Sequence, residues 1–260
     1  MSDDQLLARP GDLSPGIDPV KVIAPHIGTL REKSLHASLK SWYAQAGDNV
    51  EVQVDGFVID VVRDDVLIEV QTSGFSSMKN KLATLLDLGH EIRVVHPIPA
   101  QKWIVKVDLD DTIMTRRRSP KHGRITDVFS ELVGIAALTT HPNLAIEVIL
   151  TEEEEHRRQA PGRSWRRHGW TIVERRLIDV VDRRLISTNE DLAALLPSGL
   201  PQPFTTSDLA TTLERPRRLA QQMTYCLRGA GVIDVVGKSG NAVVYAVCAK
   251  TMGVGANRPR

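Results

Sequence analysis

The sequence predicts an α/β protein with two folded units, and two patterns along the chain support this prediction. Over residues 29–107, the spacing of apolar residues changes between helical and strand-like in the order α-β-β-β-α-β. From residue 201 onwards, two short helical patterns precede a β-hairpin pattern. With 260 residues, of which 42% are hydrophobic, the chain is long enough to build both units.

The expected elements follow from hydrophobic spacing. The first helix, over residues 29–44, places Leu35, Leu39 and Trp42 at the i, i+4, i+7 spacing of a buried stripe. Residues 116–124 are basic and contain Pro and Gly, so we expect a loop there. The other expected elements are strands at 50–54, 57–62, 66–71, 92–97, 103–107 and 145–150, and helices at 76–88 and 125–138.

Charge divides the chain into segments. Residues 152–184 begin with four consecutive Glu and continue with many Arg, which is typical of a solvated connection. The expected segments are a loosely ordered lead-in at 1–27, a domain at 28–151, a charged Arg-rich linker at 152–200, a second domain at 201–250 and a disordered tail at 251–260.

Composition excludes several classes of protein. The chain has no run of 18 apolar residues and its first residues are polar and acidic, so we expect a cytoplasmic protein with no membrane span and no signal peptide. Cys226 and Cys248 form no CxxC pair, which excludes a disulfide framework and a thiolate zinc site. The net charge of +1 identifies no partner, because acidic and basic clusters cancel along the chain.

The most informative segment is residues 57–71, FVIDVVRDDVLIEVQ, which predicts a β-hairpin. With a two-residue turn after Arg63, this residue pairs with Val66, and the same register places Asp60 opposite Glu69. The remaining side chains divide into the acid-bearing face, which includes Gln71, and an apolar face with Ile59, Val61, Ile68 and Val70.

Two opposed carboxylates need a compensating cation, because like charges across a strand pair destabilise it and burial adds to the cost. Mg²⁺ or Mn²⁺ would supply that charge. Mg²⁺ binds one or two carboxylates and takes further oxygens from water and from a substrate phosphate. Asp60 and Glu69 are therefore candidate metal ligands at a phosphodiester-hydrolysing site. The alternative is a solvated strand face without a metal.

The segment Ile59-Asp60 followed by Glu69-Val70-Gln71 resembles the motif of the PD-(D/E)xK nuclease superfamily. The resemblance covers residues 29–107 and implies a restriction-endonuclease-like αβββαβ core with a mixed central sheet. It also implies that Asp60, Glu69 and Gln71 are catalytic, with Asp60 and Glu69 holding the metal. The D-x8-E-x-Q pattern alone matches many unrelated sequences by chance. The matching order of helices and strands strengthens the resemblance.

This chain departs from the superfamily motif at two positions. Ile59 replaces a Pro that the superfamily commonly lacks, and Gln71 replaces the usual Lys, which leaves the water-activating group open. In some members the lysine lies on the following helix, so Lys79 and Lys81 are candidates, although both also fit as ordinary surface lysines. Members often carry a further acid on the first helix. Glu32 matches it as a third catalytic and metal-binding candidate, and the alternative is an exposed pair with His36.

The C-terminal pattern of helix, turn, helix and β-hairpin resembles a winged helix-turn-helix domain. Thr205 or Thr206 can cap the first helix, and Pro216 can open the second. The second helix buries Leu219, Met223 and Leu227. The candidate nucleic-acid-binding side chains are Arg217, Arg218, Gln221, Gln222 and Arg228 on this helix and Lys238 in the hairpin.

The sequence therefore predicts a metal-dependent DNA endonuclease that is targeted by a winged helix. Two alternatives stay open: a nuclease-like DNA-binding regulator that has lost catalysis, and an interaction protein whose winged helix binds another subunit. The sequence does not decide between DNA and RNA, nor whether the chain forms a homodimer.

Overall fold

The computed structural model of the protein describes residues 34–160 and 169–248. The first half of the described chain alternates helices and strands as the spacing predicts. Its elements are α1 (Ser34–Tyr43), β1 (Asn49–Val54), β2 (Phe57–Arg63), β3 (Val66–Val70), η1 (Phe75–Met78), α2 (Lys79–Asp87), β4 (Glu91–Val107) and β5 (Ile113–Arg118).

The second half begins with a broken helical segment and ends in a small three-stranded sheet. Its elements are η2 (Ile125–Val128), α3 (Phe129–Leu132), η3 (Val133–Leu138), β6 (Leu144–Gln159), β7 (Trp170–Ile186), α4 (Asn189–Ala193), β8 (Phe204–Thr205), α5 (Thr206–Leu213), α6 (Arg217–Gly229), β9 (Ile233–Ser239) and β10 (Ala242–Val247).

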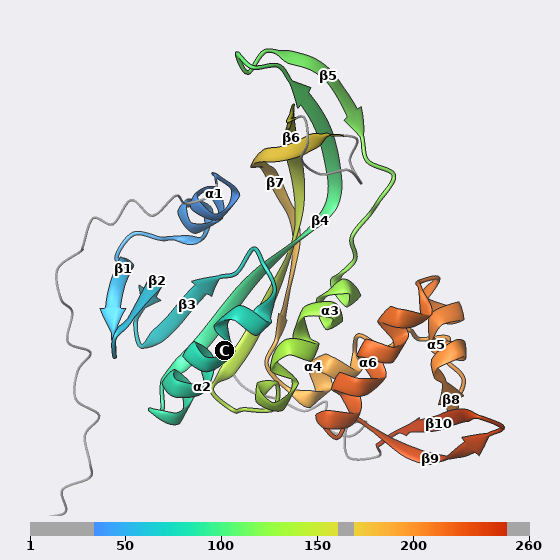
Figure 1. Cartoon of the computed structure of the whole chain (residues 1–260). Coiled ribbons are helices and arrows are strands. Elements are labelled where there is room, and N and C mark those ends of the chain that lie inside the picture. Colours follow the sequence, from blue (N-terminus) through green and yellow to red (C-terminus); the bar gives the residue numbers. More distant parts are fainter. Residues whose placement is uncertain (1–33, 161–168, 249–260) are drawn as a thin grey trace, which may run out of the picture.

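A mixed seven-stranded sheet forms the centre of the molecule (Figure 1). Its order is β1-β2-β3-β4-β6-β7, and β5 pairs with the far end of β4. Strands β1 to β3 are an antiparallel meander, whereas β3 and β6 both run parallel to β4. The fold is therefore of the α/β class, as the sequence predicts.

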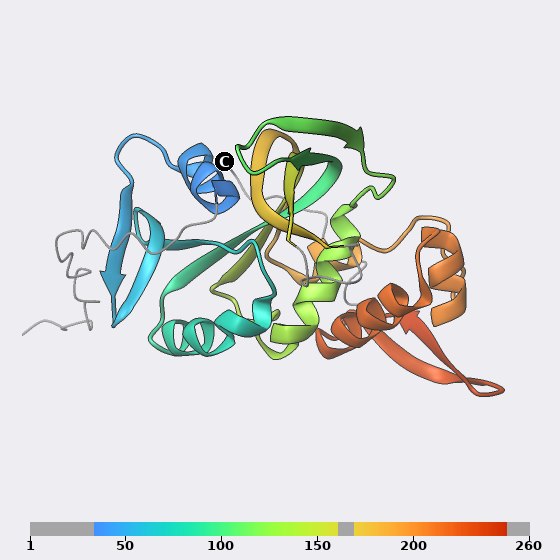
Figure 2. The same ribbon diagram turned by 45° about the horizontal axis from the view of Figure 1, so that its top comes forward.

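Helices cover the two faces of this sheet. On one face, Leu35, Leu39 and Tyr43 of α1 pack against Val61 and other residues of a small core cluster. On the other face, α2 and α3 lie on a larger cluster that includes Leu82 and Phe129. The turned view in Figure 2 shows α2 and α3 together on one side of the strands.

The charged residues 152–159 and 170–186 belong to strands β6 and β7 of the sheet, so the expected linker is wrong over these residues. Strands β6 and β7 pair antiparallel along most of their length, and β4 pairs parallel with β6. Some of the charges that suggested a solvated connection pair with one another between strands. For example, Arg175 Nη2 lies 2.7 Å from Glu153 Oε2, whose side chain is fully buried.

Several smaller expectations also change. Residues 92–107 form one continuous strand, and the expected loop at 116–124 begins inside β5. The expected helix at 125–138 breaks into three short segments, with a non-helical backbone at Ile135. In α1, Trp42 is 44% exposed and Tyr43 is buried in its place. Tyr43 is held inside because its hydroxyl donates to Glu147 Oε2 at 2.5 Å.

The C-terminal module, residues 189–247, shares its core with the rest of the protein. One continuous cluster contains Phe129 of α3, Leu209 of α5, and Met223 and Leu227 of α6. Thr205 caps α5 with a capping box, in which its hydroxyl accepts from Asp208 N and the Asp208 carboxylate accepts from Thr205 N. Cys226 is buried and Cys248 partly buried, both as free thiols.

Within the described ranges, no helix combines the length and the apolar character needed to cross a membrane. The expected lead-in at 1–27 and the expected tail at 251–260 lie outside the described residues.

Candidate functional site

The hairpin of β2 and β3 has the register that the sequence predicts. Arg63 pairs with Val66, and the ladder continues to the pair Val61 and Ile68. The next pair in this register is Asp60 and Glu69, where the strands part. Here the Asp60 side chain takes the place of a backbone partner, because its Oδ2 accepts a hydrogen bond of 2.8 Å from Val70 N.

The backbone is irregular at this point. Glu51 of β1, which lies beside Asp60 in the β1–β2 register, has a left-handed φ of 56°. Side-chain alternation is also interrupted in β2. Ile59 packs in the α2-side core, whereas Val61 packs in the α1-side core. The expected single apolar face is therefore wrong for Ile59, although Ile68 and Val70 do lie with Val61.

Asp60 faces the first helix. Its Oδ2 lies 3.2 Å from His36 Nε2, and only 16% of its side chain is exposed. Burial opposes ionisation of this carboxyl, but the hydrogen bond and charge of His36, together with the Val70 N–H, lower its pKa below the usual value. Asp60 is thus a carboxylate at neutral pH.

Glu69 faces the second helix. Lys81 Nζ lies 2.5 Å from Glu69 Oε1 and also donates to the carbonyl oxygen of Val58 at 2.6 Å. Burial raises the pKa of Glu69 to about 7, the nearby Asp60 charge adds to this rise, and Lys81 opposes it. Of the two candidate lysines, Lys81 reaches Glu69, whereas Lys79 is exposed to solvent.

Gln71 holds the connection between β3 and η1. Its Nε2 donates to Gly74 O at 3.1 Å and to Ser77 Oγ at 2.9 Å. The backbone carbonyl oxygen of Gln71 accepts a hydrogen bond of 2.6 Å from Nδ1 of the buried His96. These contacts fix the loop that leads from Glu69 to α2, a role that sequence reasoning missed.

Glu32, the remaining candidate ligand, lies outside the described residues. Within the described part of the chain, no group of three or more His, Cys, Asp and Glu side chains is close enough to hold a metal ion. The described site therefore contains two carboxylates, Asp60 and Glu69, each with a basic partner from a different helix.

The candidate nucleic-acid residues divide between two surfaces of α6. Arg217, Gln221 and Arg228 line an outward groove of about 420 Å³ together with β10. Arg218 and Gln222 instead line a larger cavity on the side of the main sheet. Lys238 lies exposed on β9 and lines neither space.

The outward groove also contains Tyr225, which is 55% exposed and which the sequence reasoning missed. Its position four residues after Gln221, on the polar side of the helix, was the available signal. A half-exposed tyrosine beside arginines is a suitable surface for a nucleotide or another planar polar group.

Comparison with known proteins identifies relatives of the described sheet and its helices. The family model described as Domain of unknown function (DUF8091) matches residues 33–187, which contain both carboxylates and all seven strands of the sheet. An uncharacterized protein of Treponema pallidum (strain Nichols) is 33% identical over 188 residues, covering 72% of this chain and 74% of that protein. No solved structure matches the chain. The protein is therefore a member of the DUF8091 family.

Proposed function

We propose that this protein is a metal-dependent nuclease that hydrolyses phosphodiester bonds in DNA. The observation that carries the proposal is the position of Asp60 and Glu69, which meet where β2 and β3 part, with Lys81 of α2 at the same point. Two carboxylates and an ammonium group at a break in a sheet have the composition of a phosphoryl-transfer site.

The surrounding fold supports the proposal. The order of elements from α1 to β4 is α-β-β-β-α-β, and β4 runs parallel to β3. This is the arrangement that the PD-(D/E)xK resemblance implies. Lys81 supports it further, because an ammonium from the following helix lies where the motif lysine, replaced here by Gln71, would be expected.

The donor set fits Mg²⁺ or Mn²⁺. Both ions favour carboxylate oxygens, and Mg²⁺ needs only one or two from the protein. The raised pKa of Glu69 shows that burial and the Asp60 charge act against its ionised form, and a divalent cation would relieve both effects. Asp60 and Glu69 would hold the ion, and Glu32 is proposed to complete its shell. The ion would polarise the scissile phosphate and lower the pKa of a bound water.

The chain's own groups have separate roles in this proposal. Lys81 keeps Glu69 oriented and adds positive charge near the phosphate. His36 favours the ionised form of Asp60. Gln71 positions the loop before α2 and, through that loop, the start of the helix that carries Lys81.

The C-terminal module is proposed to be a winged helix that binds DNA. Its order α4-β8-α5-α6-β9-β10, with β8, β9 and β10 in one small sheet, supports this interpretation. In such a module the second helix of the pair lies in the major groove. Arg217, Gln221 and Arg228 on the outward side of α6 would contact bases and phosphates there.

A second function, a DNA-binding regulator without catalysis, is favoured by one observation. Each carboxylate already has a basic partner, His36 for Asp60 and Lys81 for Glu69, so each has a compensating charge without a metal.

Nicking of supercoiled plasmid separates the two functions. We expect wild-type protein to nick plasmid in Mg²⁺ or Mn²⁺ but not in EDTA, and Glu69→Gln to lose roughly 100-fold or more in rate while binding DNA normally. The matched control is Asp55→Asn, which removes an exposed acid that pairs with His90 away from the site. If wild-type protein cleaves neither plasmid nor linear, branched or single-stranded DNA, the regulator is the better account.

A further inference from the structure

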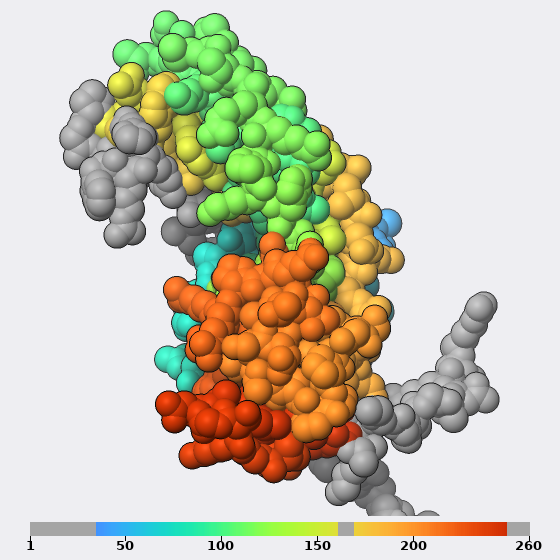
Figure 3. All heavy atoms as spheres, turned by 90° about the vertical axis from the view of Figure 1, so that its right-hand side faces the viewer, coloured from blue at the N-terminus to red at the C-terminus, as the bar shows by residue number. Residues whose placement is uncertain are grey.

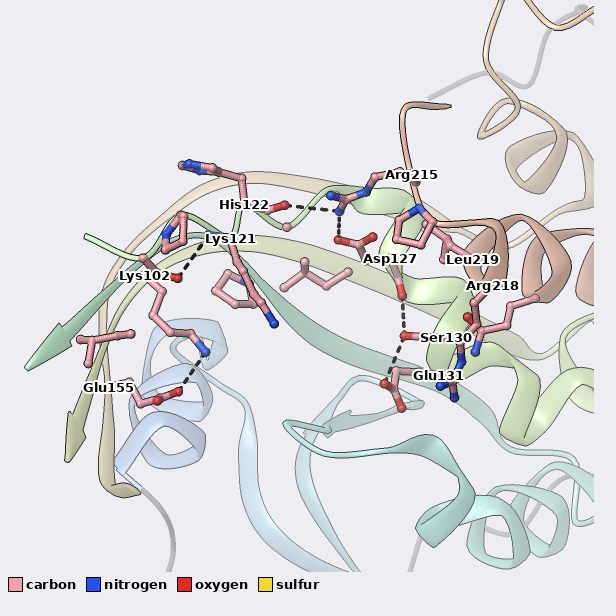
Figure 4. A pocket seen from close by; sticks show the side chains of 18 of the residues that line it. Lys102, Lys121, His122, Asp127, Ser130, Glu131, Glu155, Arg215, Arg218 and Leu219 are labelled. Atoms are coloured by element: carbon pink, nitrogen blue, oxygen red, sulfur yellow. Dashed lines mark hydrogen bonds and ion pairs between the residues drawn. The ribbon is translucent and has the colours of Figure 1, made fainter. Parts of the chain in front are cut away.

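A cavity of about 1220 Å³ lies between the start of α6 and the curved part of the sheet (Figure 4). Its floor comes from Ile98 and Ile104 of β4, and its walls come from the loop 119–123, the α3 segment and α6. In the space-filling view of Figure 3, the orange C-terminal module lies directly against the green segment that follows β5. The cavity is therefore a junction between the two halves of the molecule.

Two arginines fix this junction. Arg124 Nη1 donates to Leu213 O at 2.9 Å, so the main sheet's loop holds the end of α5. In return, Arg215 pairs with Asp127 and donates to His122 O at 3.3 Å. These reciprocal contacts keep the two walls of the cavity at a set separation.

The cavity is positively charged. Six Lys and Arg line it against three Asp and Glu. Lys102 and Arg157 share Glu155 at 3.2 and 2.5 Å, and Arg215 pairs with Asp127. In the described chain the three remaining cations have no carboxylate partner, and they come from three different elements: Arg117, Lys121 and Arg218.

One lining residue of the cavity, Glu131, lies beside the loop that follows Glu69. It lies so close to Gly74 that a Cβ there would be 3.2 Å from Glu131 Oε2. Gly74 O in turn accepts the hydrogen bond from Gln71, two residues after Glu69. Gly74 and Gln71 therefore lie between the cavity and Glu69, whose side chain faces α2.

We propose that this cavity binds the sugar–phosphate backbone of one DNA strand and leads it from α6 toward Asp60 and Glu69. The inference rests on the proposed function, because it names the path of the substrate to that site. Three unpaired cations on separate walls can each contact a different phosphate of a strand. A single anion would need only one of these cations. The volume exceeds the usual range for a small ligand, about 300–1000 Å³.

The lining also indicates how the strand is held. Among the described lining residues there is no Phe, Tyr or Trp, so bases have no ring on which to stack. The apolar side chains Ile98, Ile104 and Leu219 can contact sugars instead. Binding in the cavity would therefore depend on charge and salt and would show little preference for base sequence.

The test is the affinity for labelled single-stranded and duplex oligonucleotides by fluorescence anisotropy in EDTA, where no cleavage interferes. We expect Lys121→Ala with Arg218→Ala to weaken strand binding about tenfold and to reduce the slope of log K against log salt by about two. The matched control is Arg183→Ala, an arginine with a 70% exposed side chain on the other face of the sheet. Both changed residues are exposed, and a melting curve for each variant verifies its fold.

The outcomes separate this inference from the proposed function. If the double variant binds strands like wild type, while Arg217→Ala with Arg228→Ala weakens binding, the inference is wrong and the proposed function stands. If the double variant loses affinity for deoxyadenosine monophosphate but not for strands, the cavity is a site for a free phosphate anion and the inference is again wrong. If the double variant loses affinity for strands as expected, but neither the wild type nor any variant nicks plasmid, the cavity binds DNA strands and the proposed nuclease activity is wrong.

Discussion

Lys81 Nζ lies 2.5 Å from Glu69 Oε1 and donates to the carbonyl oxygen of Val58 at 2.6 Å. One ammonium group therefore joins α2 to both strands of the hairpin. If it replaces the motif lysine, Lys81→Met should reduce nicking roughly 100-fold. Gln71→Lys in the same variant should restore part of the rate, because it supplies an ammonium two residues after Glu69. Lys79→Met, on the exposed side of the helix, serves as the control. A rate that does not recover would assign Lys81 a structural role.

Divalent metal should stabilise the folded protein through Asp60 and Glu69. We expect excess Mg²⁺ or Mn²⁺ to raise the melting temperature by a few degrees, since each kcal/mol of binding adds roughly 2–4 °C in a chain of this size. Asp60→Asn should remove the rise, and Asp55→Asn should keep it. Differential scanning fluorimetry measures both shifts. An equal rise in the Asp60 variant would place the ion elsewhere.

The stability of the protein should depend on pH through Glu69. Its pKa rises from the ordinary 4.5 to about 7 in the folded state, because burial penalises the carboxylate. Between these values the folded state binds more protons than the unfolded state, so the free energy of unfolding should fall as pH rises, by up to about 3 kcal/mol. Urea unfolding of wild type and Glu69→Gln at about pH 5 and about pH 8 tests this. The free energy of unfolding should fall less between these pH values in Glu69→Gln than in wild type. An equal fall in both proteins would contradict the prediction.

Metal binding should depend on the same ionisation. Because the ion requires the Glu69 carboxylate, the metal-induced rise in melting temperature should grow between about pH 6 and about pH 8. Scanning fluorimetry with and without Mn²⁺ across this range gives the comparison. A rise of constant size would mean that Glu69 is not a ligand.

The outward side of α6 should carry duplex binding. Arg217→Ala with Arg228→Ala removes two exposed cations from the groove that also contains Tyr225. We expect weaker binding and a salt slope reduced by about two, as for two lost phosphate contacts. Anisotropy at several salt concentrations gives the slope, with Arg183→Ala as the control. An unchanged slope would exclude this side of the helix from the DNA interface.

The shared core should make the molecule unfold in one step. Phe129 of α3 is fully buried in the cluster that extends into α5 and α6. Phe129→Ala should reduce the free energy of unfolding by about 3–5 kcal/mol. It should lower the temperature of a single unfolding transition, rather than of one transition out of two. Calorimetry distinguishes the cases. Two separate transitions would show that the C-terminal module folds independently.

The sequence was informative where local patterns dominate. The hairpin register followed from turn length alone, and Arg63 does pair with Val66. The structure caps α5 with Thr205, one of the two candidates that the sequence offered, and it confirms the buried stripe of Leu219, Met223 and Leu227. In each case the signal lies within one or two turns or one hairpin.

Long-range partners were the source of the errors. Glu153 and Arg175 are 22 residues apart, and they pair between β6 and the edge strand β7, where the sequence indicated a linker. Tyr43 replaces Trp42 inside because Glu147, 104 residues away, accepts its hydroxyl. The spacing of residues within a short segment gives no information about partners that lie far away in the sequence. For the same reason the carboxylates were predictable as a pair, but the helices that supply His36 and Lys81 to them could be proposed only as candidates.

The continuous core between α3 and α6 has a consequence for where a nuclease of this design would cut. Modules on a flexible tether sample many separations, so cleavage would be scattered around the bound sequence. Here the core packing and the contacts of Arg124 and Arg215 hold α6, the helix that we propose binds DNA, against the sheet that carries Asp60 and Glu69. The cleaved bond would then lie at a fixed number of base pairs from the position on the DNA where α6 binds.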